Sequence, residues 1–126
     1  MEDAKKILVV DDNRTIKMLL ERRLSAEGYK VITAGDGREG LATAAREMPD
    51  LILSDVDMPI MDGGEMVSKL KASIKTSHIP VIFLTSLITK DENARPASGE
   101  NWYISKMAKP TELLVAIRER LSLLPK

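Results

Sequence analysis

The feature that most constrains this chain is the alternation of short apolar runs with longer segments of helical periodicity. The runs are rich in β-branched residues, as strands are, and they span residues 7–10, 31–33, 51–53, 79–84 and 102–104. Between them, apolar residues recur at three-to-four spacing, which places them on one face of a helix. These residues are Ile16, Leu19, Leu20 and Leu24; Leu41, Ala44, Ala45 and Met48; Met66, Leu70 and Ile74; and Leu113, Ile117 and Leu121.

Strands that alternate with helices predict an α/β fold with a five-stranded parallel sheet, because each right-handed crossover returns the chain to the same end of the sheet. Helices then cover both faces, in a doubly wound arrangement. Central strands of such a sheet are buried on both sides, which agrees with the uninterrupted apolar character of residues 7–10 and 51–53. The length of 126 residues is typical of one domain, so we expect a single domain over residues 1–126.

Composition excludes several classes of function. Nineteen basic and nineteen acidic side chains balance, so we expect neither direct nucleic-acid binding nor a polybasic membrane patch. The chain has no cysteine, which removes thiolate metal sites and thiol nucleophiles, and its one histidine is too few for typical zinc hydrolase chemistry. The first residues resemble neither a secretory signal nor a transmembrane segment. We therefore expect a cytoplasmic protein.

Acidic side chains follow two strands that a doubly wound sheet places side by side. Asp11 and Asp12 follow the first strand, and Asp55 and Asp57 follow the third. One such acid is well explained as a helix cap, but several crowded carboxylates raise one another's pKa unless a cation or a proton intervenes. Carboxylates without histidine or cysteine favour Mg²⁺, or Mn²⁺, over zinc. Because Mg²⁺ often shares its coordination with phosphate, the pattern indicates phosphoryl chemistry.

Two further polar residues follow the last two strands. The fourth strand leads into Thr85, whose hydroxyl is able to donate to a phosphoryl oxygen, and the fifth leads through Ser105 into Lys106. Taken alone, Thr85 reads as an ordinary strand-end residue and Lys106 as a solvated lysine. Taken with the acids, they predict a site with both charges at one edge of the sheet.

Together these residues resemble those of bacterial two-component response-regulator receiver domains. The matching segments are residues 6–13 (KILVVDDN), 49–55 (PDLILSD), 58–63 (MPIMDG), 79–86 (IPVIFLTS) and 103–106 (YISK). The resemblance spans nearly the whole chain. It implies a flavodoxin-like (βα)5 fold with strand order 2-1-3-4-5.

The resemblance also implies the roles of the acids. Asp55 would be the phosphoacceptor, and Asp11, Asp12 and Asp55 would bind Mg²⁺ together with the backbone carbonyl of Asp57. The chain would then be a phosphorylation-dependent switch rather than an enzyme, although it would promote its own phosphorylation and dephosphorylation. Its partners would be a sensor histidine kinase or phosphotransfer protein and a downstream protein effector.

The same resemblance assigns three residues to catalysis and switching. Thr85 and Lys106 would contact the phosphoryl group, and Tyr103 would rotate inward when Thr85 moves. Family members usually have Lys-Pro-Phe after the fifth strand, whereas Met107 follows Lys106 here and a Lys-Pro pair occurs only at Lys109. We prefer Lys106, because its three-residue spacing from Tyr103 is the usual one. Loss of the proline removes a fixed turn, so the lysine would be placed less rigidly.

Two other departures concern regulation. The segment 87–101, where the family has its fourth helix, contains Pro96 and Gly99, so we expect that helix to be short, irregular or absent. The family's usual output surface includes that helix and would be altered. Asp57 adds a negative charge beside the path by which water reaches the phosphoryl group, which predicts an effect on phosphate lifetime.

Three alternatives stay open at this point. Asp55 and Asp57 have the spacing of the nucleophile pair in haloacid-dehalogenase-type phosphatases, although they follow a third strand rather than a first. A degenerate receiver would use the same fold for protein binding without phosphorylation. The chain would also suit either a stand-alone receiver or part of a longer protein.

Overall fold

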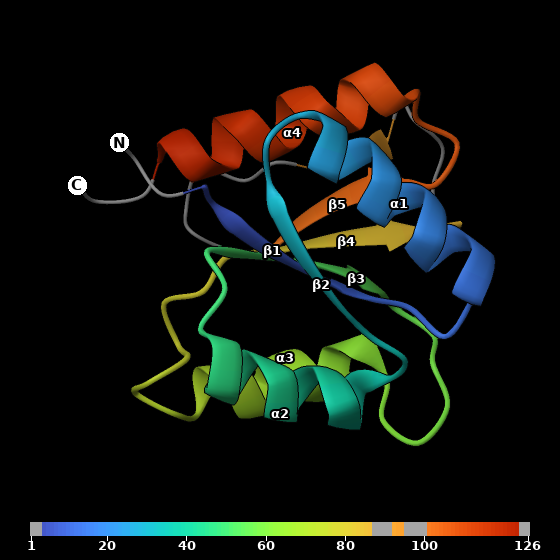
Figure 1. Ribbon diagram of the computed structural model, residues 1–126. Helices are drawn as coiled ribbons and strands as arrows, with labels where there is room; N and C mark the ends of the chain where they lie inside the picture. Colours follow the sequence, from blue (N-terminus) through green and yellow to red (C-terminus); the bar gives the residue numbers. More distant parts are fainter. Residues whose placement is uncertain (1–3, 87–91, 95–100, 124–126) are drawn as a thin grey trace.

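The computed structural model has the predicted α/β architecture (Figure 1). It describes residues 4–86, 92–94 and 101–123. All neighbouring strand pairs are parallel, and the order β2-β1-β3-β4-β5 confirms the predicted 2-1-3-4-5 topology. The strands are β1 (Lys6–Val10), β2 (Lys30–Ala34), β3 (Leu51–Asp55), β4 (Val81–Thr85) and β5 (Trp102–Ser105).

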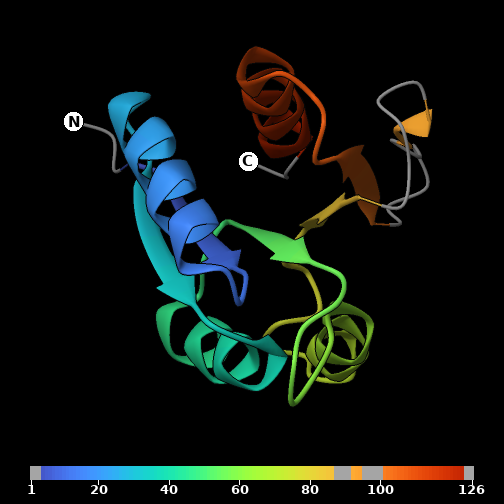
Figure 2. The same cartoon turned by 90° about the vertical axis from the view of Figure 1, so that its right-hand side faces the viewer.

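Four helices are described, and they form two layers. They are α1 (Arg14–Ala26), α2 (Gly37–Glu47), α3 (Gly63–Lys71) and α4 (Pro110–Ser122). Figure 2 shows α1 and α4 on one side of the sheet and α2 and α3 on the other. Because the chain crosses over in both directions from its central strands, the carboxyl ends of β1 and β3 lie together at one edge.

Short polar side chains determine where three of the helices begin. Asn13, Asp36 and Asp62 each stand just before a helix, and each accepts a hydrogen bond from the backbone N–H three residues later, at 3.0, 2.8 and 2.8 Å respectively. The fourth helix, α4, begins instead with Pro110, whose missing N–H would have no partner inside the helix. These caps fix where each loop at the carboxyl edge of the sheet joins its helix.

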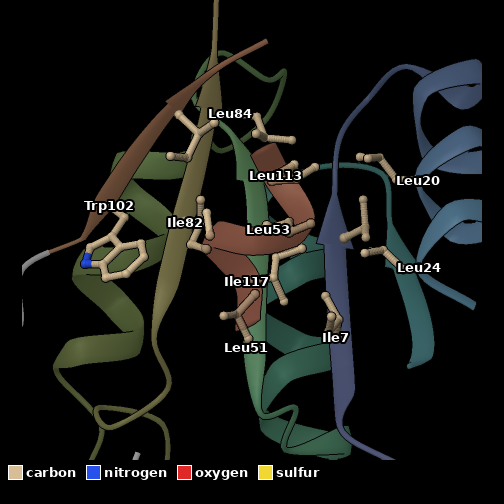
Figure 3. Close-up of a cluster of buried hydrophobic side chains, with 13 residues drawn as sticks. Ile7, Leu20, Leu24, Leu51, Leu53, Ile82, Leu84, Trp102, Leu113 and Ile117 are labelled. Atoms are coloured by element: carbon tan, nitrogen blue, oxygen red, sulfur yellow. The ribbon is translucent and has the colours of Figure 1, made fainter. Parts of the chain in front are cut away.

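The core has one apolar cluster on each face of the sheet. On one face, Ile7 and Leu53 of the sheet pack with Leu24 of α1 and Ile117 of α4, as Figure 3 shows. On the other face, the alternate residues of the same strands, including Ile52, pack against α2 and α3. Both faces of β1 and β3 are therefore buried, which explains why their sequences are apolar without interruption.

Some residues predicted to lie on buried helix faces do not. The third helix ends at Lys71, and Ile74 is 96% exposed in the turn that follows. The hydroxyl of Thr76 donates to the carbonyl of Leu70 at 2.7 Å, so this turn replaces the next turn of helix. Leu19 of α1 is 44% exposed. The spacing of apolar residues alone overestimates the extent of the buried helix faces, because it does not show where a helix ends or how wide its buried face is.

The prediction of a short, irregular or absent helix within residues 87–101 falls mainly outside the described residues. In the part that is described, the backbone of Ala94 exchanges two hydrogen bonds with Tyr103 of β5, at 2.9 and 2.8 Å. The side chain of Asn93 accepts a third from the backbone N–H of Ser105 at 2.7 Å. These contacts lie along the outer edge of β5.

Candidate functional site

Three carboxylates meet at the carboxyl edge of the sheet. Asp11 follows β1 directly, Asp12 is next, and Asp55 is the last residue of β3. One oxygen of each lies within 4.8 Å of the others. Asp11 is buried and Asp12 is exposed, so the cluster opens to solvent on one side.

Backbone hydrogen bonds orient two of these carboxylates. Oδ1 of Asp11 accepts from the N–H of Asn13 at 2.8 Å, and Oδ1 of Asp55 accepts from the N–H of Val56 at 2.8 Å. Each bond occupies one oxygen and orients the carboxyl group. The site is therefore held by the loops that lead out of the strands.

Burial and neighbouring carboxylates disfavour the ionised form of Asp11. Burial raises the pKa of Asp11 above the ordinary value, and the nearby charges of Asp55 and Asp12 raise it further. The hydrogen bond from Asn13 and the charge of Lys106 act in the opposite direction. A divalent cation would relieve this repulsion, and a cluster of oxygen ligands suits Mg²⁺ or Mn²⁺ better than zinc. The residues present therefore fit a magnesium site.

Lys106 supplies a positive charge to the same site. Its Nζ lies 3.2 Å from Oδ2 of Asp55, and both side chains are mostly shielded from solvent. The structure thus brings Lys106, and not Lys109, to the cluster; Lys109 instead immediately precedes the first residue of α4. Thr85 is 4% exposed at the end of β4, and its carbonyl accepts from the N–H of Lys106 at 2.9 Å.

The turn after Lys106 uses hydrogen bonds in place of the missing proline. The N–H of Met107 donates to Oγ of Ser105 at 3.0 Å, and the N–H of Ala108 donates to the carbonyl of Ser105 at 3.0 Å. Proline at position 107 would have no N–H to donate. Sequence reasoning missed the role of Ser105, although a serine two residues before a turn residue is a recognisable signal.

Tyr103 lies on the edge strand β5, outside the carboxylate cluster. It is 40% exposed, and its ring stacks on Phe83 of β4 with ring centroids 5.2 Å apart. Asp57 is exposed in the loop after β3. Sequence reasoning did not single out Phe83, although the predicted pairing of the last two strands would have placed it beside Tyr103.

Two glycines, which sequence reasoning also did not single out, allow the loop after β3 to pack closely. A Cβ added to Gly63 would lie 2.5 Å from the carbonyl oxygen of Asp55 and 2.7 Å from Cε1 of Phe83. The N–H of Gly37, at the start of α2, donates to the carbonyl of Met61 at 2.9 Å. At each glycine the backbone therefore lies directly against the backbone of another segment, where a side chain would not fit.

Comparison with known proteins defines the class to which this fold and site belong. The family model for the response regulator receiver domain matches residues 7–118, so the chain belongs to the response regulator receiver domain family. The chain is 43% identical over 114 residues to the response regulator PleD of Caulobacter vibrioides, a match that covers 90% of this chain and 25% of PleD.

Two solved structures show the same fold. The signal receiver domain of a histidine kinase from Syntrophus aciditrophicus has a TM-score of 0.83 and 32% identity, with 98% of this chain and 94% of that chain covered. The receiver domain of the sensor histidine kinase PA1611 from Pseudomonas aeruginosa has a TM-score of 0.80 and 29% identity, with 94% and 98% covered. The PA1611 structure has a magnesium ion coordinated in its active site cleft.

Membership of this family establishes the general setting. Receiver domains serve two-component signalling, receive phosphoryl groups from histidine kinases and bind Mg²⁺ at an acidic site, and they are generally non-catalytic signalling domains. The chain spans less than half the length of the curated relatives that it matches. Among the described helices, none is long and apolar enough to cross a membrane.

Proposed function

We propose that this chain is a phosphorylation-dependent switch that accepts a phosphoryl group on Asp55. The observation that carries the proposal is the meeting of three carboxylate oxygens within 4.8 Å, with the ammonium group of Lys106 at 3.2 Å from Asp55. Asp11, Asp12 and Asp55 would hold Mg²⁺ with the backbone carbonyl of Asp57. In this proposal, residues 1–126 form one receiver domain.

The reaction needs positioning and charge neutralisation more than proton transfer. A carboxylate oxygen of Asp55 attacks phosphorus in line, the new O–P bond forms, and the P–N bond to a phosphohistidine breaks, with its electron pair leaving on the imidazole nitrogen. Mg²⁺, when bound, neutralises negative charge on the carboxylates and on the phosphoryl oxygens. Lys106 is already beside Asp55 and balances the charge that remains.

Phosphorylation would then act on the residues around Asp55. The phosphoryl group brings additional negative charge and strong acceptor oxygens to the end of β3. Thr85, at the end of the neighbouring strand, and Lys106 would donate to those oxygens. Movement of Thr85 would in turn favour a different position of the Tyr103 side chain on β5, which a protein effector would recognise. The donor would be a sensor histidine kinase or a phosphotransfer protein.

Labelling with acetyl phosphate tests the proposal. The wild-type chain should gain one phosphoryl group in the presence of Mg²⁺, detected by mass spectrometry, and should gain little after chelation with EDTA. Asp55→Asn should abolish labelling. The matched control is Asp36→Asn, the same chemical change at the start of α2, where the amide oxygen still caps the helix.

Each other outcome points to a different function. Full labelling of Asp55→Asn would place the nucleophile elsewhere. An unlabelled wild-type chain would indicate a degenerate receiver that binds partners without phosphorylation. Continuous release of phosphate over many turnovers would indicate a phosphatase.

A further inference from the structure

A row of side chains crosses the sheet from the residue before Asp55 to the edge strand β5. In the register of β3, β4 and β5, Ser54 pairs with Phe83, and Phe83 pairs with Tyr103. Ser54 and Phe83 are buried, whereas Tyr103 is half-exposed. The row therefore connects the neighbour of Asp55 with a side chain that a partner is able to contact.

Gly63 joins the main chain of Asp55 to this row. An added Cβ on this glycine would lie 2.5 Å from the carbonyl oxygen of Asp55 and 2.7 Å from the ring of Phe83, so both groups lie against Gly63. The same carbonyl accepts a hydrogen bond from the hydroxyl of Ser54 at 2.7 Å. Because protein interiors are close-packed, a shift of this carbonyl displaces its neighbours instead of being absorbed by a void.

The ring of Phe83 carries such a displacement to the surface. The planes of Phe83 and Tyr103 are inclined by 25° and their centroids are 5.2 Å apart, which is a stacked aromatic pair. The backbone of Tyr103 is held on both sides, by β4 and by its two hydrogen bonds to Ala94. A displacement of Phe83 would therefore reach the Tyr103 side chain more readily than the Tyr103 backbone.

We propose that Phe83 is a positioning residue that couples the state of Asp55 to the orientation of Tyr103. The inference rests on the proposed role of Asp55 as the phosphoacceptor. The coupling runs through the Gly63 contact and the aromatic stack, and it acts in addition to the hydroxyl of Thr85. Phosphorylation thereby changes the orientation of a side chain at the outer edge of β5.

The chain offers a simple readout, because it has two tyrosines, Tyr29 and Tyr103. Incorporation of 3-fluorotyrosine gives two fluorine NMR resonances, which Tyr29→Phe assigns. In the wild-type protein, Mg²⁺ with beryllofluoride, a mimic of the phosphoryl group, should shift the Tyr103 resonance. In Phe83→Leu this shift should fall by about half or more, while labelling by acetyl phosphate stays within about twofold of wild type.

Two further variants separate coupling from general damage to the fold. Ile82→Leu changes the neighbouring β4 residue, which faces the opposite core cluster, and should retain the wild-type shift. Phe83→Tyr keeps an aromatic ring and should retain most of the wild-type shift. Phe83→Met serves as the test if the leucine variant does not fold.

Three outcomes would overturn the coupling role. They are an unchanged Tyr103 shift in Phe83→Leu, a labelled wild-type protein whose Tyr103 resonance does not move, and loss of labelling in a folded Phe83→Leu, which would make Phe83 part of the site itself. Failure of the wild-type protein to label would contradict the proposed function instead, so the two failures are distinguishable.

Discussion

Removal of one charge from the carboxylate cluster should stabilise the protein when no metal is bound. Unit charges about 5 Å apart repel by about 1 kcal/mol in bulk water and by about 3 kcal/mol at an effective dielectric of about 20. Asp11 is buried and has two carboxylates within 4.8 Å, and the charge of Lys106 offsets part of the repulsion. We therefore expect Asp11→Asn to raise the free energy of unfolding by about 1 to 3 kcal/mol in EDTA.

The variant is close to isosteric and retains the local hydrogen bond. The amide oxygen of asparagine still accepts from the N–H of Asn13, which is 2.8 Å from Oδ1 of Asp11 in the wild type. Magnesium should reverse the order of stability of the two proteins. A ligand that binds only the folded state stabilises that state by about 2.7 kcal/mol at about one hundred times its Kd. The wild type should gain this stabilisation and Asp11→Asn should gain much less of it.

Urea unfolding measures both effects. Trp102 is the single tryptophan and is 4% exposed, so its fluorescence should report unfolding of the core. Asp36→Asn again serves as the control, since it removes a charge outside the cluster and keeps its helix cap. An Asp11→Asn protein no more stable than wild type in EDTA would refute the electrostatic reasoning. Equal stabilisation of both proteins by Mg²⁺ would remove Asp11 from the metal site.

Three further predictions follow from single side chains. Ile60 is 74% exposed with a φ of 70°, which a β-branched residue adopts at a cost, so Ile60→Asn should stabilise the fold by about 1 kcal/mol in the same urea assay, whereas Ile74→Asn should change little. Asp57→Asn should change the rate at which the phosphorylated chain loses its phosphoryl group, as followed by mass spectrometry; an unchanged rate removes the role suggested for this side chain. The hydrogen bond from Lys6 to Glu47 lowers the pKa of the Glu47 carboxyl in the folded protein. This bond therefore stabilises the fold at pH values above the ordinary glutamate pKa, and the stabilisation is lost as the pH falls through the lowered pKa. Glu47→Gln should therefore lose less stability than wild type on acidification, and matching pH profiles would contradict this.

Much of the architecture was predictable from the sequence because it depends on local and periodic signals. Apolar runs without interruption indicate strands that are buried on both faces, and strands that alternate with helices allow few topologies. These signals assign residues 7–10 and 51–53 to strands, and the two runs lie within β1 and β3. The same signals predict that the acids after these strands meet, since parallel neighbours end at one edge of the sheet.

The choice between two lysines depended on the tertiary structure. Spacing from Tyr103 favoured Lys106 over Lys109, but only the path of the turn after β5 brings one ammonium group to 3.2 Å from Asp55. The hydrogen bond from Met107 to Ser105, which shapes that turn where the proline is missing, is a contact between particular atoms that residue pattern does not specify.

The close contacts between side chains and backbone across the sheet were likewise not predictable from the sequence. Gly63 reads as part of a loop motif, and Phe83 as one apolar residue in a strand. Gly63 contacts both the carbonyl of Asp55 and the ring of Phe83, because α3 begins directly against β3 and β4. The sequence by itself determined which residues are apolar, charged or turn-forming, and therefore the elements and their order. Which atoms touch at the site was decided by the tertiary structure, because those distances depend on how helices and strands from distant parts of the chain pack together.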